Sequence, residues 1–138
     1  MSDIFSTLTI SASGMKAQSA RIKVIAENIA NAETAGTTPD AKPYTRKTIT
    51  FRNELDRKLG VDQVQVNKIG QDTDKPYPVK YMPDHPGADA QGYVKMPNVD
   101  PLVEAMDMRE AQRSYEANLG MIDQARSMYS QTVDILRH

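Results

Sequence analysis

Cysteine and tryptophan are absent from this chain of 138 residues, and only two histidines are present. Without cysteine, the chain can form no disulfide, no thiolate nucleophile and no cysteine-ligated zinc site. The histidines, His85 and His138, fall in a predicted turn and at the last position, where a solvated imidazole is far commoner than a metal ligand or an acid–base catalyst. The sequence therefore predicts neither a metal nor another cofactor.

The chain also lacks a strong charge of either sign and any long apolar run. With 17 basic and 18 acidic residues its formal net charge is −1, so no bulk field draws it to nucleic acid or to an anionic membrane. No apolar stretch approaches the roughly 20 residues of a membrane-spanning helix. The opening stretch MSDIFSTLTI lacks the basic start and apolar run of a secretory signal. We therefore expect no nucleic-acid binding, no direct membrane insertion and no export by a cleaved signal peptide.

No arrangement of residues points to catalysis. The glycines are scattered and none is followed by the GK[ST] of a phosphate loop. Carboxylates near the C-terminus, such as Glu104, Asp107 and Asp123, are interpreted as an exposed helix face, and Glu110 has a basic partner three residues on at Arg113. Tyrosines in the middle of the chain could stack on sugars or single strands, but without a basic groove packing is the commoner role. We predict that the chain is not an enzyme.

Proline and glycine are concentrated in the middle of the chain, which divides it into three segments. Residues 32–98 contain all but one of the eight prolines and five of the seven glycines, so a long helix is excluded there. The segments on either side are nearly free of such residues. We therefore predict a terminal-helix coiled-coil domain made of residues 1–31 and 99–138, and a β-rich insert with extended loops at residues 32–98.

Both terminal segments carry apolar residues in a heptad pattern of period 3.5, which is typical of helices that pack along a narrow stripe. In the first segment, polar residues interrupt the stripe at Ser11 and Gln18. The residues predicted to pack are Ile4, Leu8, Met15, Ile22, Ile25 and Ile29 in the first helix, and Met108, Tyr115, Leu119, Ile122, Tyr129, Val133 and Leu136 in the second. An antiparallel coiled coil of the two helices would cover both stripes, which predicts a mainly α fold with a small β insert.

A pair of helices covers only part of its own apolar surface. Met106, Met121 and Met128 fall outside the main stripe, and methionine adapts to several packing environments. We therefore expect further chains to complete the burial. An intramolecular coiled coil in a monomer is the simpler alternative.

Four stretches of the insert have the composition of strands. They are YTRKTITF (Tyr44–Phe51), VQVNKI (Val64–Ile69), YPVKY (Tyr77–Tyr81) and the segment Gly92–Lys95, with a turn at DHPG (Asp84–Gly87). The sequence leaves their pairing open. The run GYVKMPNVDP then leads into the second helix, with Asp100 as the expected N-cap and Pro101 at the first helical position.

The stretch AENIANAETAG (Ala26–Gly36) resembles the asparagine-rich signature of the flagellar axial proteins, which form the rod, the hook and the filament junctions. The residues that match this signature are Asn28, Ala30, Asn31, Thr34 and Gly36. Thr37 stands where the signature has tyrosine, so the loop beyond Gly36 should differ from that of the hook-type members.

A second and more specific resemblance is to the short proximal-rod members of the same family. It is carried by GYVKMPNVD, RSYEAN and SMYSQT, and it covers both ends of the chain and part of the insert. The residues singled out by this match are Gly92, Tyr93, Met96, Pro97, Asn98, Asp100, Ser114, Tyr115 and Asn118.

This resemblance implies a structural subunit that assembles helically into a hollow, periplasm-spanning rod, which transmits torque and houses the export channel. It implies secretion through the flagellar type III export apparatus, terminal helices that are loosely folded before assembly, and contacts with other copies, other rod subunits and the rod-base adaptor. Two alternatives remain open: another member of the rod subunit set, and a soluble coiled-coil adaptor or scaffold.

Overall fold

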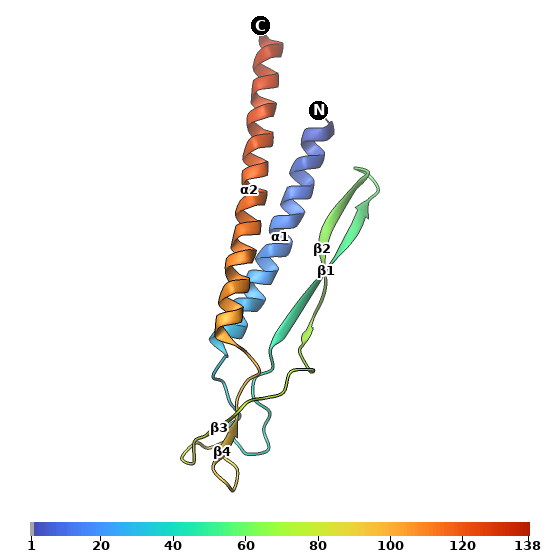
Figure 1. Cartoon of the computed structure of the whole chain (residues 1–138). Coiled ribbons are helices and arrows are strands. Elements are labelled where there is room, and N and C mark those ends of the chain that lie inside the picture. Colours follow the sequence, from blue (N-terminus) through green and yellow to red (C-terminus); the bar gives the residue numbers. More distant parts are fainter. Residues whose placement is uncertain (1) are drawn as a thin grey trace. The chain divides into compact units, whose positions relative to one another are not determined.

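The computed structural model describes residues 2–138 and consists of a helix, four strands and a second helix in chain order (Figure 1). The elements are α1 (Ser2–Ala30), β1 (Lys47–Asp56), β2 (Val61–Gln71), β3 (Val79–Tyr81), β4 (Tyr93–Lys95) and α2 (Pro101–Arg137). The predicted order, with terminal helices on either side of a small β-rich segment, is confirmed. Neither helix of this described part combines the length and apolarity that a membrane span requires.

The first two predicted strands lie where expected, but their limits were wrong. The first begins at Lys47 instead of Tyr44 and continues to Asp56. The residues before Lys47 are not in the sheet because their amides bond elsewhere: the Tyr44 N–H donates to the Thr34 carbonyl, and the Arg46 N–H donates to the Asn98 side chain. Backbone pairing then extends the strand through polar residues whose side chains carry no strand signal.

A tight turn joins β1 to β2, and the two strands form a two-stranded sheet. The Asp56 carboxylate accepts hydrogen bonds from the N–H groups of Lys58 and Leu59, at 2.9 and 3.3 Å. Gly60 ends the turn with φ at +67°, a left-handed conformation that favours glycine. Local side-chain bonds and one glycine therefore specify this hairpin.

The strands β3 and β4 form a second, short antiparallel sheet in which Tyr81 faces Tyr93. The two tyrosine rings meet edge to face at 5.3 Å, and both are largely exposed. On the opposite face Val94 is buried. The predicted strand at Tyr77–Tyr81 is confirmed only from Val79 onward, and the predicted turn over the DHPG sequence is present.

The chain divides into two compact units, each of which draws on both halves of the sequence. The helix-end unit comprises residues 2–22, Thr50–Lys68 and Arg109–His138, and the junction unit comprises Lys23–Ile49 and Ile69–Met108. Each unit contains parts of both long helices and of the segment between them. The sequence-based division at residues 31 and 99, which follows secondary structure, stays a prediction.

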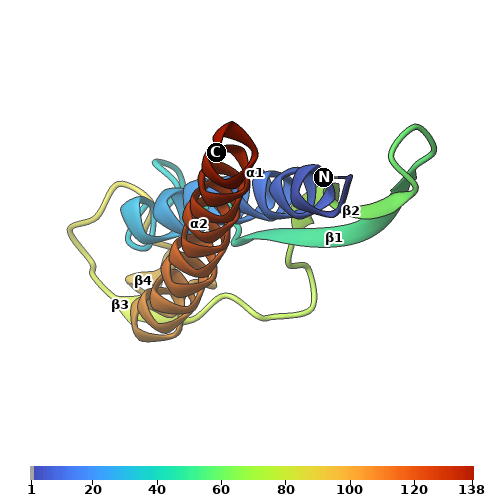
Figure 2. The ribbon, with the colours of Figure 1, turned by 90° about the horizontal axis from the view of Figure 1, so that it is seen from above.

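Within the helix-end unit, α1 and α2 contact each other in antiparallel order. The Phe5 and Tyr129 rings lie 6.1 Å apart, and Arg21 forms a 3.4 Å ion pair with Glu110. As residue numbers rise along α1, their partners on α2 fall. In the same unit the β1–β2 hairpin lies beside α1, where the Val64 N–H donates to the Ser13 hydroxyl at 3.2 Å (Figure 2).

One glycine lies at a close contact between the two helices. A Cβ at Gly14 would lie 2.8 Å from the amide nitrogen of Asn118, a separation that real side chains do not adopt. That same amide nitrogen donates to the Ser114 carbonyl at 3.0 Å, so the Asn118 side chain is not free to move without losing a bond. The helix pair therefore depends on the absence of a side chain at position 14.

The two helical glycines should respond in opposite ways to substitution. A Cβ at Gly120 would have no neighbouring atom within 4 Å, so Gly120→Ala should raise the free energy of unfolding by about 1 kcal/mol through helix propensity alone. Gly14→Leu should lower it, because the added side chain collides with Asn118. Thermal unfolding followed by circular dichroism of the helical signal measures both. Stabilisation by both substitutions would contradict the close approach of the helices.

Candidate assembly site and its polar junction

A buried carboxylate lies at the centre of the junction unit. The Glu104 side chain, in the first turn of α2, is only 1% exposed, and its Oε1 accepts a hydrogen bond from the Arg46 Nε. The Arg46 guanidinium also lies 3.6 Å from Asp72 and 3.8 Å from Asp107. Burial of the guanidinium opposes its charge, but the bond to Glu104 and the three nearby carboxylates outweigh burial and raise the pKa of Arg46. The arginine is therefore permanently charged.

The buried side chain of Asn28, near the end of α1, pairs with the backbone as a strand would. Its Nδ2 donates to the Lys47 carbonyl at 2.9 Å, and its Oδ1 accepts from the Lys47 N–H at 2.8 Å. The Tyr44 hydroxyl donates to the same Oδ1 at 2.8 Å, and burial raises the pKa of this hydroxyl. Nδ2 also donates to Glu104 at 3.3 Å. Asn28 therefore joins α1 to the start of β1 and to α2.

A second buried asparagine has the same role for the segment that precedes α2. The Asn98 Oδ1 accepts from the Arg46 N–H at 2.8 Å. Its Nδ2 donates to the carbonyls of Asp72 and Lys75, at 2.9 and 3.2 Å. Because both ends of this amide are used, Asn98 fixes three chain segments with a single side chain.

Asp100 caps the start of α2 as predicted, but the prediction for Glu104 was wrong. The Asp100 carboxylate accepts a hydrogen bond from the Leu102 N–H at 3.0 Å, and the helix begins at Pro101. The interpretation of Glu104 as part of an exposed helix face was wrong, since the side chain is buried. An acidic residue in a first turn suits the helix dipole whether or not it is covered. Its side-chain partners here are Arg46 and Asn28, which sequence periodicity does not place beside it.

The residues that α2 buries most are spaced by seven but are small or polar. Glu104, Ala111 and Ala125 are buried, and Asn118 is half-buried. The sequence does contain this seven-residue spacing. A search for large apolar residues misses it, because these residues are small or polar. On α1, Ser11 is buried and the Oε1 atom of Gln18 has no hydrogen-bond partner among the described residues.

The predicted packing residues show a range of exposure. On α1, Ile25 is buried, Ile4, Leu8, Met15 and Ile22 are half-buried, and Ile29 is exposed. On α2, Met108, Tyr115, Ile122 and Val133 are half-buried, and Leu119, Tyr129 and Leu136 are exposed. Apolar surface is thus left uncovered along both helices.

A second apolar stripe on α2 is about half exposed or more. Met121, Met128 and Ile135 are 51%, 49% and 75% exposed, and they follow one another in steps of seven. In the junction unit, Leu102 and Met106 of the same helix are 71% and 64% exposed. Repeated exposure of large apolar side chains on one helix marks an interaction surface.

Comparison with known proteins places these features in a family. Residues 8–37 match the model of the flagella basal body rod protein, and residues 90–135 match that of the flagellar basal body rod FlgEFG protein C-terminal region. The chain is 50% identical to the flagellar basal-body rod protein FlgC of Agrobacterium fabrum, over 93% of this chain and 91% of the relative. It is 36% identical to FlgC of Borreliella burgdorferi over 97% and 98%, and 37% identical to FlgC of Salmonella typhimurium over 91% and 92%.

The chain belongs to the FlgC family of flagellar basal-body rod proteins. It is therefore a structural subunit of the basal-body rod, and its family is not a class of enzymes. The resemblance found in the sequence is confirmed at this level.

In this FlgC-family chain the asparagine-rich motif forms the end of α1 and the turn that follows. Ala30, the last residue of α1, is exposed, and the next residue, Asn31, accepts a hydrogen bond from the Thr34 hydroxyl at 3.2 Å. A Cβ at Gly36 would lie 2.6 Å from the Ala41 carbonyl oxygen, so the loop closes tightly on this glycine. Together with Asn28, these residues redirect the chain from α1 toward β1.

The second family motif forms the strand and turn that lead into α2. Gly92 is buried with φ at +87°, and a Cβ there would lie 2.9 Å from the Tyr81 ring. The Tyr93 side chain is 47% exposed, whereas Pro97 is buried. Met96 is half-buried, and its N–H donates to the Pro78 carbonyl at 2.8 Å. The motif therefore has buried residues, Gly92 and Pro97, and an exposed tyrosine, Tyr93.

Removing the arginine of the junction should destabilise the junction unit strongly. Arg46→Met leaves the Glu104 carboxylate buried without its charged partner, which should lower the free energy of unfolding by about 3 kcal/mol or more. The matched control is Arg52→Met, because Arg52 pairs with Glu54 at an exposed position and its loss should cost less than about 1 kcal/mol. Urea unfolding measures both, and equal effects would refute the special role of Arg46.

Proposed function

We propose that this rod subunit assembles with further copies of itself and with other rod subunits into a hollow helical rod. The rod spans the periplasm, transmits torque from the motor to the hook and encloses the export channel. The observation that carries the proposal is the repeated exposure of large apolar side chains along α2, in a chain whose relatives are rod proteins. A surface of this kind is costly in water unless neighbouring subunits cover it.

The finer packing we propose is a coiled coil of the terminal helices, extended by neighbouring subunits. The half-buried residues Leu8, Met15 and Ile22 on α1, and Tyr115 and Ile122 on α2, are only partly covered within one chain. Contacts from adjacent subunits would complete their burial. Methionine on the exposed stripe suits positions where the same side chain meets slightly different neighbours.

The polar junction gives the subunit a stiff base, which torque transmission requires. Arg46, Asn28 and Asn98 connect the end of α1, the start of β1, the end of β2 and the start of α2 through buried hydrogen bonds. Buried charges in this arrangement tolerate little displacement, because a shift leaves them unpaired. The proposed role of the junction is to hold the first turn of α2 at a fixed angle to the insert.

Export and first docking are proposed from the same family relationship. We expect the flagellar type III apparatus to secrete the chain without cleaving it, and the rod-base adaptor to be among its neighbours. Export through a narrow channel requires a loosely folded chain. The small and polar residues that α2 buries are consistent with helices that pair weakly before assembly.

Charge introduced into the helix stripes should stop rod assembly. Ile22→Asp and Ile122→Asp each place a carboxylate at a half-buried position, where it must lose water without gaining a partner. Both variants should be expressed but give non-motile cells without rods in electron micrographs. The exposed neighbours provide controls, since Lys23→Asp and Gln124→Asp should leave motility intact. Normal motility in both isoleucine variants would reject the proposed packing.

The isolated chain distinguishes a rod subunit from a soluble adaptor. A subunit whose folding is coupled to assembly should show less helix by circular dichroism than the full lengths of α1 and α2, which are 29 and 37 residues. Limited proteolysis should then trim both ends. A fully helical, protease-resistant monomer or dimer in dilute solution would favour the adaptor instead.

A further inference from the structure

The two compact units of the chain differ in the apolar side chains that they bury. In the described part of the helix-end unit, these belong to three alanines: Ala17, Ala111 and Ala125. In the junction unit they belong to Val24, Ile25 and Val94. A buried alanine removes much less apolar area from water than a buried valine or isoleucine does. The fully buried core of the helix-end unit is therefore the smaller of the two.

The surface along which α1 meets α2 in the helix-end unit is made of small and polar residues. Gly14 lies against Asn118, and Arg21 pairs with Glu110, so both of these α1 residues face α2. Gln18 follows Gly14 by four positions and precedes Arg21 by three, which places it on the same face of the helix. We call this face of α1, with Gly14, Gln18 and Arg21, the helix seam.

The side-chain oxygen of Gln18 is buried without a donor. Its Oε1 atom has no hydrogen-bond partner among the described residues. The Asn118 amide nitrogen, also at the seam, donates to the Ser114 carbonyl at 3.0 Å instead. An acceptor that is buried without a donor destabilises the closed state relative to an open state in which water reaches it.

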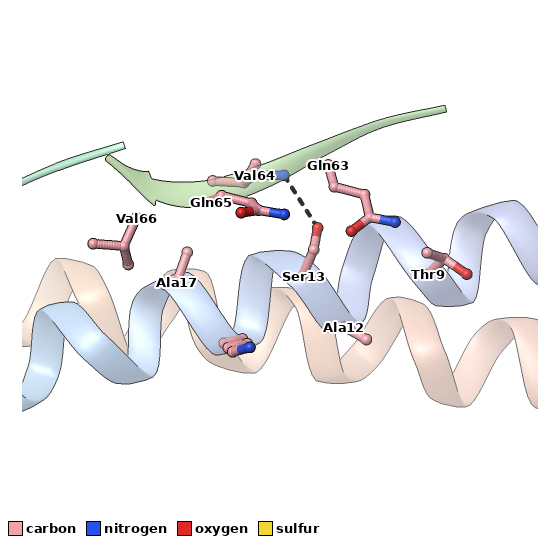
Figure 3. A pocket seen from close by; sticks show the side chains of 9 residues that line it. Thr9, Ala12, Ser13, Ala17, Gln63, Val64, Gln65 and Val66 are labelled. Atoms are coloured by element: carbon pink, nitrogen blue, oxygen red, sulfur yellow. Dashed lines mark hydrogen bonds between the residues drawn. The ribbon is translucent and has the colours of Figure 1, made fainter. Parts of the chain in front are cut away.

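The β1–β2 hairpin packs loosely on the other side of α1. Figure 3 shows β2 crossing over the helix, to which it is tied by the 3.2 Å hydrogen bond from the Val64 N–H to the Ser13 hydroxyl. Between strand and helix there is a groove of about 540 Å³, with small α1 side chains such as Ala12 and Ala17 in its lining. Atoms that line an open groove lack packing partners on one side. The hairpin therefore adds little to the burial within this unit.

We propose that the helix-end unit opens in one step while the junction unit stays folded, and that the unpaired amide of Gln18 lowers the cost of this opening. Regions with few buried apolar contacts open at a lower free energy than the rest of a protein. The junction unit stays closed because its buried polar side chains have partners, as Glu104 has in Arg46 and Asn28. The opening belongs to the single chain. Its use, to let the helices exchange partners with those of neighbouring subunits, rests on the proposed function.

Hydrogen exchange of the purified full-length chain tests the opening. The seam amides are residues 11–22 and 113–125, in the middle of the helices, and the junction amides are residues 27–31 and 105–108, at helix ends. Helix ends ordinarily fray and exchange first. We expect the reverse order here, with junction amides exchanging more slowly than seam amides by about tenfold or more. Seam amides that exchange as slowly as the junction amides would overturn the proposal.

The Gln18→Met variant tests the role of the amide, because methionine has a similar length and no group that requires a donor. Exchange of the seam amides should slow by about tenfold, as expected when a buried acceptor without a partner is removed. The matched control is Gln124→Met, which makes the same change at an exposed position of α2 in the same unit and should leave the rates unchanged. Equal slowing in both variants, or in neither, would refute the role of Gln18.

A third variant distinguishes opening of one unit from unfolding of the whole chain. Val94→Ala removes buried apolar atoms from the junction unit and should speed exchange of the junction amides by about tenfold. The seam amides should keep their original rate, since they open without the junction. If both sets of amides speed up by the same factor, the two units unfold together and the proposal is wrong.

The outcomes separate this inference from the proposed function. All of these measurements use the chain in solution, so seam and junction amides that open together would overturn the inference whatever the chain assembles into. Absence of the unaltered chain from basal bodies would instead reject the proposed function and leave the opening of the helix-end unit in place.

Discussion

The rest of the structure depends on the way in which the Glu104 carboxylate is held out of water. A buried carboxylate is tolerated only when a positive charge and hydrogen-bond donors replace its hydration, and Arg46 and Asn28 supply them. Arg46 precedes β1, Asn28 lies near the end of α1, and Glu104 is in the first turn of α2. Satisfying one carboxylate therefore requires segments that are 76 residues apart in the chain to meet in one place.

The helix pair and the junction differ in the kind of side chain that they bury. At the junction, buried polar groups have complete sets of partners, which makes that packing specific. Along the helices, the apolar residues that α2 buries fully are small, such as Ala111 and Ala125, and its large apolar side chains are half-buried or exposed. One chain alone therefore covers only part of the apolar surface of its helices.

Much of the architecture could be predicted from the sequence because it is local. Breaker-free heptad segments predict the two helices, Asp100 and Pro101 predict the start of α2, and proline and glycine mark the insert between them. The extents of the strands could not be predicted so well. Tyr44 to Arg46 have strand-like residues, but the N–H groups of Tyr44 and Arg46 bond to Thr34 and Asn98 instead of to a neighbouring strand.

The sequence by itself determined the family, the order of elements and the absence of cysteine chemistry, since each of these depends on residue type and spacing. Only the tertiary structure decided that Glu104 is buried, that Arg46 pairs with it, and that Gly14 lies against Asn118 of the other helix. Periodicity locates a residue on a face of its own helix. It does not say which distant segment covers that face, because that choice is made by contacts between residues far apart in the chain.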